Sequence, residues 1–249
     1  MKPLFLLIAV LSLPTWAQNC AQIDEKLTIH YQKMQNAGSY FDHFDDEVLE
    51  RETKLFTETL QFLKAPESWQ CDFSKVQEAG IRVEMSEDKQ LRIFSWDWQT
   101  GGTMHDFGSM WQYRQLKGKT KTKFQESSNW VESVHQTSLN QQTYYWVMGR
   151  NIGDGRNHML TAELYQILDQ GLQPAKLIKT SKFTNEISFV YDPSTVREQQ
   201  EQVNFFYDEK SKKLRFPVVI EKDASNSGTP TNKWIQYRFN GQYFVREKN

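Results

Sequence analysis

The sequence has no excess of charge of either sign, few cysteines and no second long apolar run. Its net charge of −1 at pH 7 gives no signal for nucleic acid or an anionic membrane surface as a partner. Beyond the first residues, no segment approaches the roughly eighteen consecutive apolar residues that a membrane-spanning helix needs. The sequence therefore predicts neither a nucleic-acid partner nor a transmembrane segment.

Catalytic and metal-binding motifs with a recognisable short spacing are also missing. There is no Gly-x-Ser-x-Gly elbow and no Cys-x-x-Cys, and the five histidines never occur as His-x-x-x-His. We therefore predict no metal site and no cofactor, and the sequence assigns no catalytic residue. The two carboxylates of a glycoside hydrolase need only be close in space, so a pair remains open among the strand residues Asp97, Asp106, Glu132 and Glu163.

The amino-terminal residues have the three parts of a secretory signal peptide. Lys2 supplies the basic start and Leu4–Leu13 the apolar stretch. Thr15 and Ala17 supply the small residues that precede a cleavage site. We expect residues 1–17 to be removed by cleavage near Ala17, and the mature protein to be periplasmic or secreted.

Cys20 and Cys71 are the only cysteines. In an oxidising compartment an even pair is expected to be bonded, and a bridge between these positions contributes about 3–4 kcal/mol on the chain-entropy model. A reactive thiol would need an activating environment, of which the sequence gives no sign. The residues before Cys20 also lack the pattern of a lipoprotein signal. We predict a Cys20–Cys71 disulfide.

Residues 22–64 carry a helical pattern. Apolar residues recur at helical spacing over Ile23–Met34 and again over Val48–Leu63. Asp45 is placed to cap the second helix, and Pro66 to stop it. Because each helix has one apolar side that must be buried, we expect an antiparallel helical hairpin.

From Ile81 onward the apolar residues follow the two-residue period of strands. About ten such runs follow one another too closely for crossover helices, so we expect an antiparallel β-domain: a barrel, a sandwich or a propeller-like meander. Asn240–Gly241 predicts a two-residue type I′ hairpin turn. Gly153–Asn157 and Asp208–Lys213 predict further hairpin loops, and Ser225–Asn232 a flexible surface loop.

The stretch "LRIFSWDWQTGGTMHDFGSMWQYR" over Leu91–Arg114 has the strongest pattern of a functional site. Its paired glycines fit a tight turn, so the stretch is first of all a β-hairpin. A His beside carboxylates can act as base, acid or ligand. However, adjacent strand residues point to opposite faces, so His105 and Asp106 should diverge, and Asp97 should share a face with Ser95 and with neither of them. The residues of this possible ligand-binding site are Trp96, Asp97, Trp98, His105, Asp106 and Trp111.

Two further patterns suggest binding surfaces. Exposed aromatic rings stack on sugars, although the same residue types also fill cores. The aromatic candidates are Trp96, Trp98, Trp111, Trp130, Tyr144, Tyr145 and Trp146. The run "KGKTKTK" over Lys117–Lys123 sets lysines at alternate positions, either as a positive stripe for an anionic envelope polymer or as protection of a strand edge against aggregation. A loop over Gly149–His158 could alternatively be presented to a hydrolase as an inhibitor.

"KQLRIFSWDWQTGGTMHDFGSMWQYR", "NEISFVYDPSTV" and "KWIQYRFNGQYFVRE" together resemble a group of uncharacterised exported proteins of Gram-negative bacteria. An SWD…GGTM stretch before a β-rich carboxyl-terminal region is the most specific element of this resemblance, which extends in patches over residues 45–249. It implies a periplasmic or envelope location. It implies no activity and no catalytic residues.

We therefore expect an α+β protein in which a helical hairpin over residues 18–75 precedes a large antiparallel β-domain over residues 76–249. The expected function is binding of an envelope polymer, a glycan or a protein. The alternative is a hydrolase that acts on envelope or extracellular carbohydrate through paired carboxylates near the Trp-rich hairpin. The sequence does not decide whether the protein is an enzyme.

Overall fold

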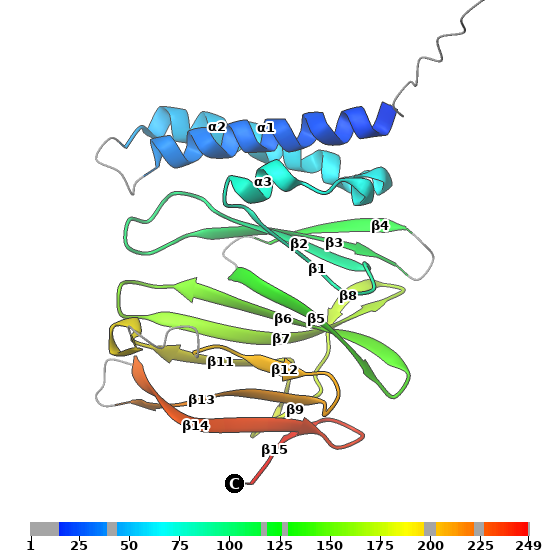
Figure 1. The fold of residues 1–249 in the computed structure, drawn as a ribbon, viewed down its shortest axis with the longest axis vertical. Coiled ribbons are helices and arrows are strands. Elements are labelled where there is room, and N and C mark those ends of the chain that lie inside the picture. The colour runs from blue at the N-terminus through cyan, green and yellow to red at the C-terminus, as the bar shows by residue number, and fades with distance from the viewer. Residues whose placement is uncertain are drawn as a thin grey trace, which may run out of the picture.

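The computed structural model describes residues 15–38, 44–115, 119–125, 129–196, 203–221 and 227–248. It confirms a β-rich α+β protein. The elements are stacked in layers, with a helical layer on one four-stranded sheet, and that sheet on a larger sheet that curls round to the carboxyl terminus (Figure 1). In the described residues, no helix is long and apolar enough to cross a membrane.

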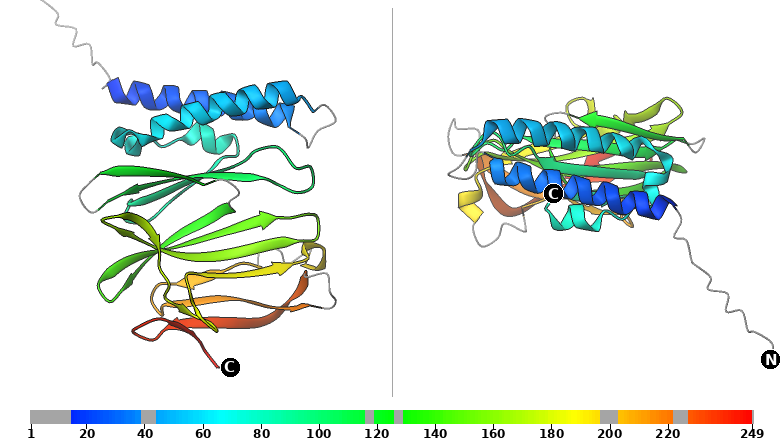
Figure 2. Two further views of the ribbon diagram at one scale, coloured as in Figure 1. Left: turned by 180° about the vertical axis from the view of Figure 1, so that it is seen from behind. Right: turned by 90° about the horizontal axis from the view of Figure 1, so that it is seen from above.

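The helical layer lies across one face of the four-stranded sheet, with its two long helices side by side (Figure 2). Its elements are α1 Thr15–Ala37, α2 Asp46–Leu60, η1 Gln61–Lys64, η2 Pro66–Gln70 and α3 Ser74–Glu78. Asp45 caps α2 as predicted, because its Oδ1 accepts a 3.0 Å hydrogen bond from Val48 N. Pro66 begins η2 after the helical path has already tightened to 3₁₀ geometry.

The predicted disulfide between Cys20 and Cys71 is present. It joins α1 to the residue that follows η2. Close by, the buried Asp24 of α1 accepts hydrogen bonds from Lys75 N at 3.1 Å and Val76 N at 2.9 Å. These backbone groups belong to the first turn of α3, so one carboxylate satisfies two amides that have no partner within that helix. The disulfide attaches the residue after η2 to α1, and the Asp24 hydrogen bonds attach the start of α3 to the same helix.

Sheet A has the strand order β1-β2-β3-β4, all antiparallel. Its strands are β1 Arg82–Met85, β2 Leu91–Asp97, β3 Phe107–Arg114 and β4 Thr120–Gln125. All seven residues of β2 are buried, because both faces of the sheet are covered. Phe94 and Trp96 pack under the helices, whereas Leu91 and Ile93 pack against the larger sheet. The alternation predicted for this strand is correct, but neither face is open to solvent.

The buried cation on the helical face of β2 is structural. Arg92, 1 % exposed, donates to Ser68 O at 2.8 Å, to Cys71 O at 2.9 Å and to Gln112 Oε1 at 2.6 Å. Burial, and then the nearby charge of Arg114, lower the pKa of Arg92 to about 10, so the guanidinium stays charged at neutral pH. These acceptors compensate the loss of hydration and hold the residues around the disulfide on sheet A.

Sheet B has the order β10-β9-β15-β14-β11-β7-β6-β5, with β13 on β14, β12 on β13 and β8 on β7. Its strands are β5 Trp130–Leu139, β6 Gln142–Ile152, β7 His158–Leu168, β8 Gly171–Pro174, β9 Ile178–Lys179, β10 Phe183–Thr184, β11 Glu186–Tyr191, β12 Phe206–Asp208, β13 Lys213–Glu221, β14 Gly228–Phe239 and β15 Phe244–Arg246. A short helix, η3 Pro193–Val196, follows β11. Two short pairings, β11 with β14 and β15 with β9, are parallel, which corrects the expectation of a purely antiparallel domain. The long connection that a parallel pair requires contains other strands here, including β12 and β13 between β11 and β14.

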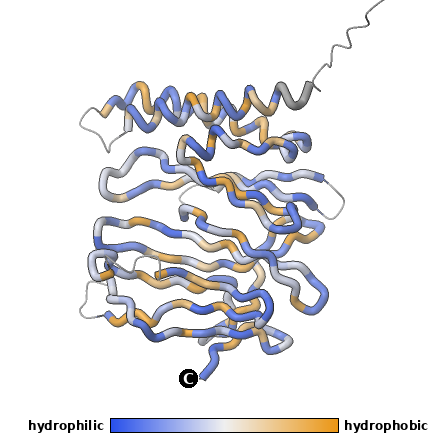
Figure 3. Tube along the Cα trace, in the orientation of Figure 1, coloured by the Kyte–Doolittle hydropathy of each residue, from blue (hydrophilic) through white to orange (hydrophobic). Residues whose placement is uncertain are grey.

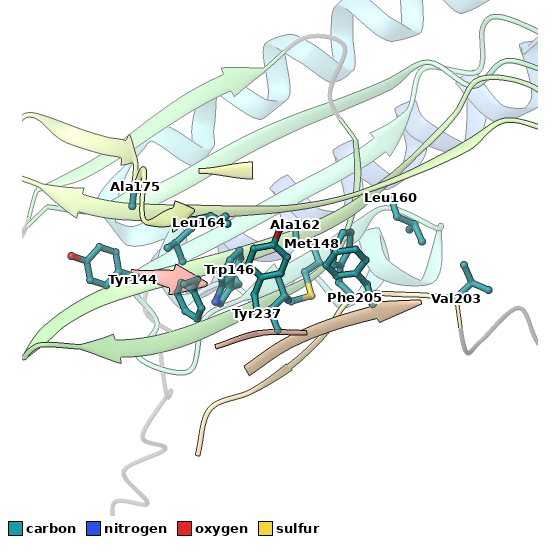
Figure 4. Close-up of a cluster of buried hydrophobic side chains, with 14 of the residues drawn as sticks. Tyr144, Trp146, Met148, Leu160, Ala162, Leu164, Ala175, Val203, Phe205 and Tyr237 are labelled. Carbon is teal, nitrogen blue, oxygen red and sulfur yellow. The ribbon is translucent and has the colours of Figure 1, made fainter. Parts of the chain in front are cut away.

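The core of sheet B forms where the sheet folds over on itself. Trp146 of β6 packs edge-to-face on Phe244 of β15, with ring centroids 5.2 Å apart. Tyr237 of β14 and Phe205 belong to the same cluster (Figure 4). Hydrophobic residues recur along the strands of both sheets (Figure 3), as the two-residue period predicts. The described residues therefore form three apolar clusters: under the helices, between the sheets, and inside the curl of sheet B.

Two loop predictions need correction. The β14–β15 hairpin pairs Phe239 with Phe244, so its loop has four residues and is no two-residue turn. Only Gly241 has positive φ there, at 99°, whereas Asn240 Oδ1 accepts hydrogen bonds from the next backbone amides. The segment predicted as the Ser225–Asn232 loop already belongs to β14 from Gly228 onward. The predicted hairpin at Asp208–Lys213 is present between β12 and β13.

Candidate functional site

The β2–β3 hairpin is present, but its loop is longer than the paired glycines suggest. Asp97 pairs with Phe107, which leaves residues 98–106 as the connection. Gly101 and Gly102 have φ of 86° and 61°, as a turn requires. Thr100 Oγ1 donates to Asp106 Oδ2 at 2.8 Å. The loop is thus fixed by its own hydrogen bonds.

This loop brings Asp97 and His105 together. His105 Nδ1 lies 2.6 Å from Asp97 Oδ2, and Asp97 Oδ1 accepts a 2.7 Å hydrogen bond from Gln99 N. The expectation that these two side chains point away from each other is therefore wrong. It assumed an extended strand at His105, whereas Gln99 adopts a positive φ of 63° and the chain turns back.

The Asp97–His105 pair lies where the two sheets and the helical layer meet. His105 N donates to Ile152 O of β6 at 3.1 Å, which ties the loop to sheet B. The Tyr31 hydroxyl of α1 accepts from Asp97 N at 3.3 Å. Burial raises the pKa of Tyr31 to about 12, so this hydroxyl is neutral at physiological pH. The pair is therefore held by a backbone group of sheet B and a side chain of the helical layer.

The neighbouring ends of β5, β6, β7 and β11 add a second polar group. Arg150 donates to Glu132 Oε1 and to the Tyr191 hydroxyl, each at 2.8 Å. Burial would lower the pKa of Arg150, but Glu132 and Tyr191 outweigh it and raise the pKa. His158 Nδ1 is buried without a hydrogen-bond partner among the described residues. Burial, then Arg150 and His105, lower the pKa of His158 and favour its neutral form.

The residues predicted as a ligand site have different environments. Trp96 is fully buried and Trp111 is 2 % exposed, so neither can stack on an external sugar. Trp98 is half-buried and packs edge-to-face on Trp96. Asp106 is exposed and bonded to Thr100 rather than to His105. Among the other aromatic candidates, Tyr144, Tyr145 and Trp146 are buried as well, which removes most of the expected stacking platform.

The four carboxylates considered for hydrolysis do not pair with one another in the contacts of the described residues. Asp97 binds His105, Glu132 binds Arg150, and Glu163 accepts from the Tyr165 hydroxyl at 2.9 Å. The sequence did not show that Glu186 of β11 lies directly across from Glu163 of β7. Burial, and then the Glu186 charge, raise the pKa of Glu163. Only the strand register, which composition does not encode, reveals this pair.

The lysine run forms the free edge of sheet A. Within the described residues, β4 pairs with β3 and with no other strand. Lys119, Lys121 and Lys123 are exposed and form no ion pair with a described residue. Lys117 lies outside the described residues. Such a row of exposed lysines, of which only Lys123 acts on a described carboxylate, Glu163, is a surface that can contact an anionic partner.

The loop considered as an inhibitory segment is short. Gly149–Ile152 belongs to β6 and His158 begins β7, which leaves five residues, 153–157, between the strands. Gly153 N donates to Asn157 O, and Asp154 accepts from Arg156 N and Asn157 N. This compact turn gives no support to presentation of a long loop.

The chain was compared with protein families, with curated proteins and with solved structures, and it matches none of them.

Proposed function

We propose that the protein is an exported binding protein of the cell envelope and that it holds an anionic partner along β4. The observation that carries this proposal is that Lys121 and Lys123 of β4, and Lys119 just before it, are exposed and form no ion pair with a described residue. The Cys20–Cys71 disulfide is the bond expected of an exported protein. The signal-like amino terminus and the SWD…GGTM resemblance support an envelope location.

The role of the β4 lysines in binding can be tested by direct titration. Fluorescent polyglutamate and purified lipopolysaccharide are titrated with wild-type protein and with the Lys121→Gln/Lys123→Gln variant. Lys121 and Lys123 would each form one exposed ion pair with the probe, and such a pair contributes up to about 1 kcal/mol of binding free energy. We therefore expect roughly a tenfold loss of affinity in the variant. Raising the salt concentration should weaken wild-type binding.

Lys176→Gln/Lys233→Gln is the matched control, because these lysines are also exposed and lie away from β4. It should bind like the wild type. If neither probe binds, or if both double variants lose the same affinity, the proposal that β4 holds the partner is wrong.

A hydrolase is the second candidate, and the Asp97–His105 hydrogen bond is the observation that favours it. A carboxylate that binds Nδ1 fixes the tautomer of a histidine and supports it as a general base. The paired-carboxylate form of this alternative has less support, since Glu163 is already bonded to Tyr165. The test is release of reducing sugar from peptidoglycan. The alternative requires activity in the wild type and loss of at least about a hundredfold in Asp97→Asn; no release by the wild type would end it.

A further inference from the structure

We infer that β4 is a strand-addition site and that the anionic partner is an extended polypeptide segment carrying carboxylates. This inference rests on the proposed function, because it names the class of partner for the same lysines. Three features of the described residues carry it: the direction of the backbone groups of β4, an uncovered part of sheet B beside it, and the placement of the lysine side chains.

The backbone of β4 presents hydrogen-bonding groups away from β3. Gln115 N donates to Lys119 O at 2.9 Å, so the backbone of Lys119 faces β3. In an antiparallel ladder the facing residues alternate, so Lys121 and Lys123 also face β3, and the N–H and C=O groups of Thr122 point outward. The six residues of β4 contain no proline and pair with β3 without a bulge. This edge has the regular geometry that an added strand requires.

Sheet B extends beyond sheet A beside β4. Glu163 and Thr161 of β7 line a small space together with Trp111 of β3, so they face sheet A. Their cross-strand partners on β11, Glu186 and Ser188, must face the same way. Both are exposed, because sheet A ends at β4. A fifth strand on β4 would continue sheet A over this uncovered part of β11.

The lysines select the charge of the added strand. Lys121 and Lys123 are two residues apart, so their side chains project to the same face, and a strand paired with β4 would place its side chains about 5 Å from them. The carboxylates of sheet B, Glu186 and the Glu163 on which the Lys123 charge already acts, belong to the other sheet, at a spacing of about 10 Å. The nearer lysines therefore dominate and favour carboxylates. The same lysines oppose pairing with a basic strand, which limits self-association at this edge.

The experiment uses the full chain and a fluorescein-labelled peptide of five Thr-Glu repeats, with a peptide of five Thr-Lys repeats as the control probe. Thr122→Pro removes the outward N–H and leaves the lysines and the β3–β4 hydrogen bonds in place. Thr122→Val is the matched variant that keeps the N–H. We expect Thr122→Pro to weaken Thr-Glu binding at least about tenfold and Thr122→Val to change it less than twofold.

Lipopolysaccharide separates this inference from the proposed function. Thr122→Pro should bind lipopolysaccharide like the wild type, since the lysines are intact, whereas Lys121→Gln/Lys123→Gln should lose both probes. If Thr122→Pro binds the Thr-Glu peptide as tightly as the wild type, or if wild-type protein binds only lipopolysaccharide, strand addition is overturned while the charge-based function stands. If Lys121→Gln/Lys123→Gln binds both probes like the wild type, the strand-addition inference and the proposed function are both wrong.

A second measurement does not depend on the folding of Thr122→Pro. In wild-type protein, amide hydrogen exchange at Thr122 should slow at least about tenfold when the Thr-Glu peptide is added, because its N–H gains a partner. The Thr-Lys peptide should leave this rate unchanged. Unchanged exchange with the Thr-Glu peptide at saturation would overturn the inference.

Discussion

Asp97 Oδ2 and His105 Nδ1 are 2.6 Å apart although the two residues are eight positions apart in the sequence, and a loop with positive φ angles at Gln99, Gly101 and Gly102 makes this contact possible. The pair connects the end of β2 to a loop that is itself bonded to β6 through Ile152. The side-chain pair therefore closes the hairpin, and the backbone of His105 links the same loop to sheet B.

We expect Asp97→Asn to destabilise the protein by about 1–3 kcal/mol. Asp97 is 7 % exposed, and its carboxylate accepts from both His105 and Gln99, so the substitution weakens buried hydrogen bonds to a charged group. Urea unfolding at neutral pH measures the loss. Asp106→Asn, at an exposed position in the same loop, should cost less. Equal losses in the two variants would show that the pair adds no stability.

Gly108→Ala should destabilise the protein by about 1–3 kcal/mol, because the site has no room for a methyl group. A Cβ at Gly108 would lie 2.6 Å from the Trp96 ring and 2.7 Å from the Trp98 ring. Thermal unfolding and tryptophan fluorescence both report the change. Gly155→Ala is the control, since no atom lies within 4 Å of its added Cβ. A Gly108→Ala protein with unchanged melting temperature and fluorescence would contradict the tight packing.

Glu52 makes the stability of the protein change with pH in the acid range. Burial raises the pKa of this carboxyl, but hydrogen bonds from His30 and Arg51 outweigh it and hold the pKa below the ordinary 4.5. The stability that the ionised Glu52 contributes is fully present above the pKa of this group in the unfolded state, and it is lost as pH falls through the pKa in the folded state. The stability difference between wild type and Glu52→Gln should therefore shrink between about pH 5 and pH 3. Melting temperatures across this range test it, with the exposed Glu58→Gln as a control that should show no such trend.

Glu163 should make stability depend on pH in the opposite direction to Glu52. Its pKa is raised by burial and by Glu186, so its favourable contribution is present below the unfolded-state pKa and is lost as pH rises through the folded-state pKa. The free energy of unfolding of Glu163→Gln should exceed that of the wild type by about 0.5–1 kcal/mol at pH 7, because one of two opposed like charges is removed. At about pH 4 the two proteins should be equally stable. Glu186→Gln should give part of the same gain, and the double variant little more. A loss of stability at pH 7 in Glu163→Gln would contradict the like-charge repulsion.

Features set by local chemistry could be predicted from the sequence. The Asp45 cap, the alternation along Leu91–Asp97 and the Cys20–Cys71 bond depend on spacing and residue type, and the structure contains all three. The Asp97–His105 contact could not be predicted, because it depends on backbone angles at a non-glycine residue, Gln99.

Layering was the other feature that the sequence did not show. Polar residues at alternate positions of a strand usually indicate a solvent-facing side, yet Arg92, Ser95 and Asp97 are all buried. Arg92 is accommodated because Ser68 and Cys71 supply carbonyl acceptors from the helical layer. The opposition of Glu163 and Glu186 likewise follows from the pairing of β7 with β11. These relations depend on which segments meet in space.

The double burial of sheet A determines how the chain can be divided. Phe94, Trp96 and Met110 face the helices, so a fragment starting at residue 76 would present this aromatic surface to water. It would also leave the Arg92 guanidinium without the Ser68 and Cys71 carbonyls. A shortened protein that begins after Cys71 should consequently aggregate, and the boundary between helices and strands in the sequence should not be used to express the β-region alone.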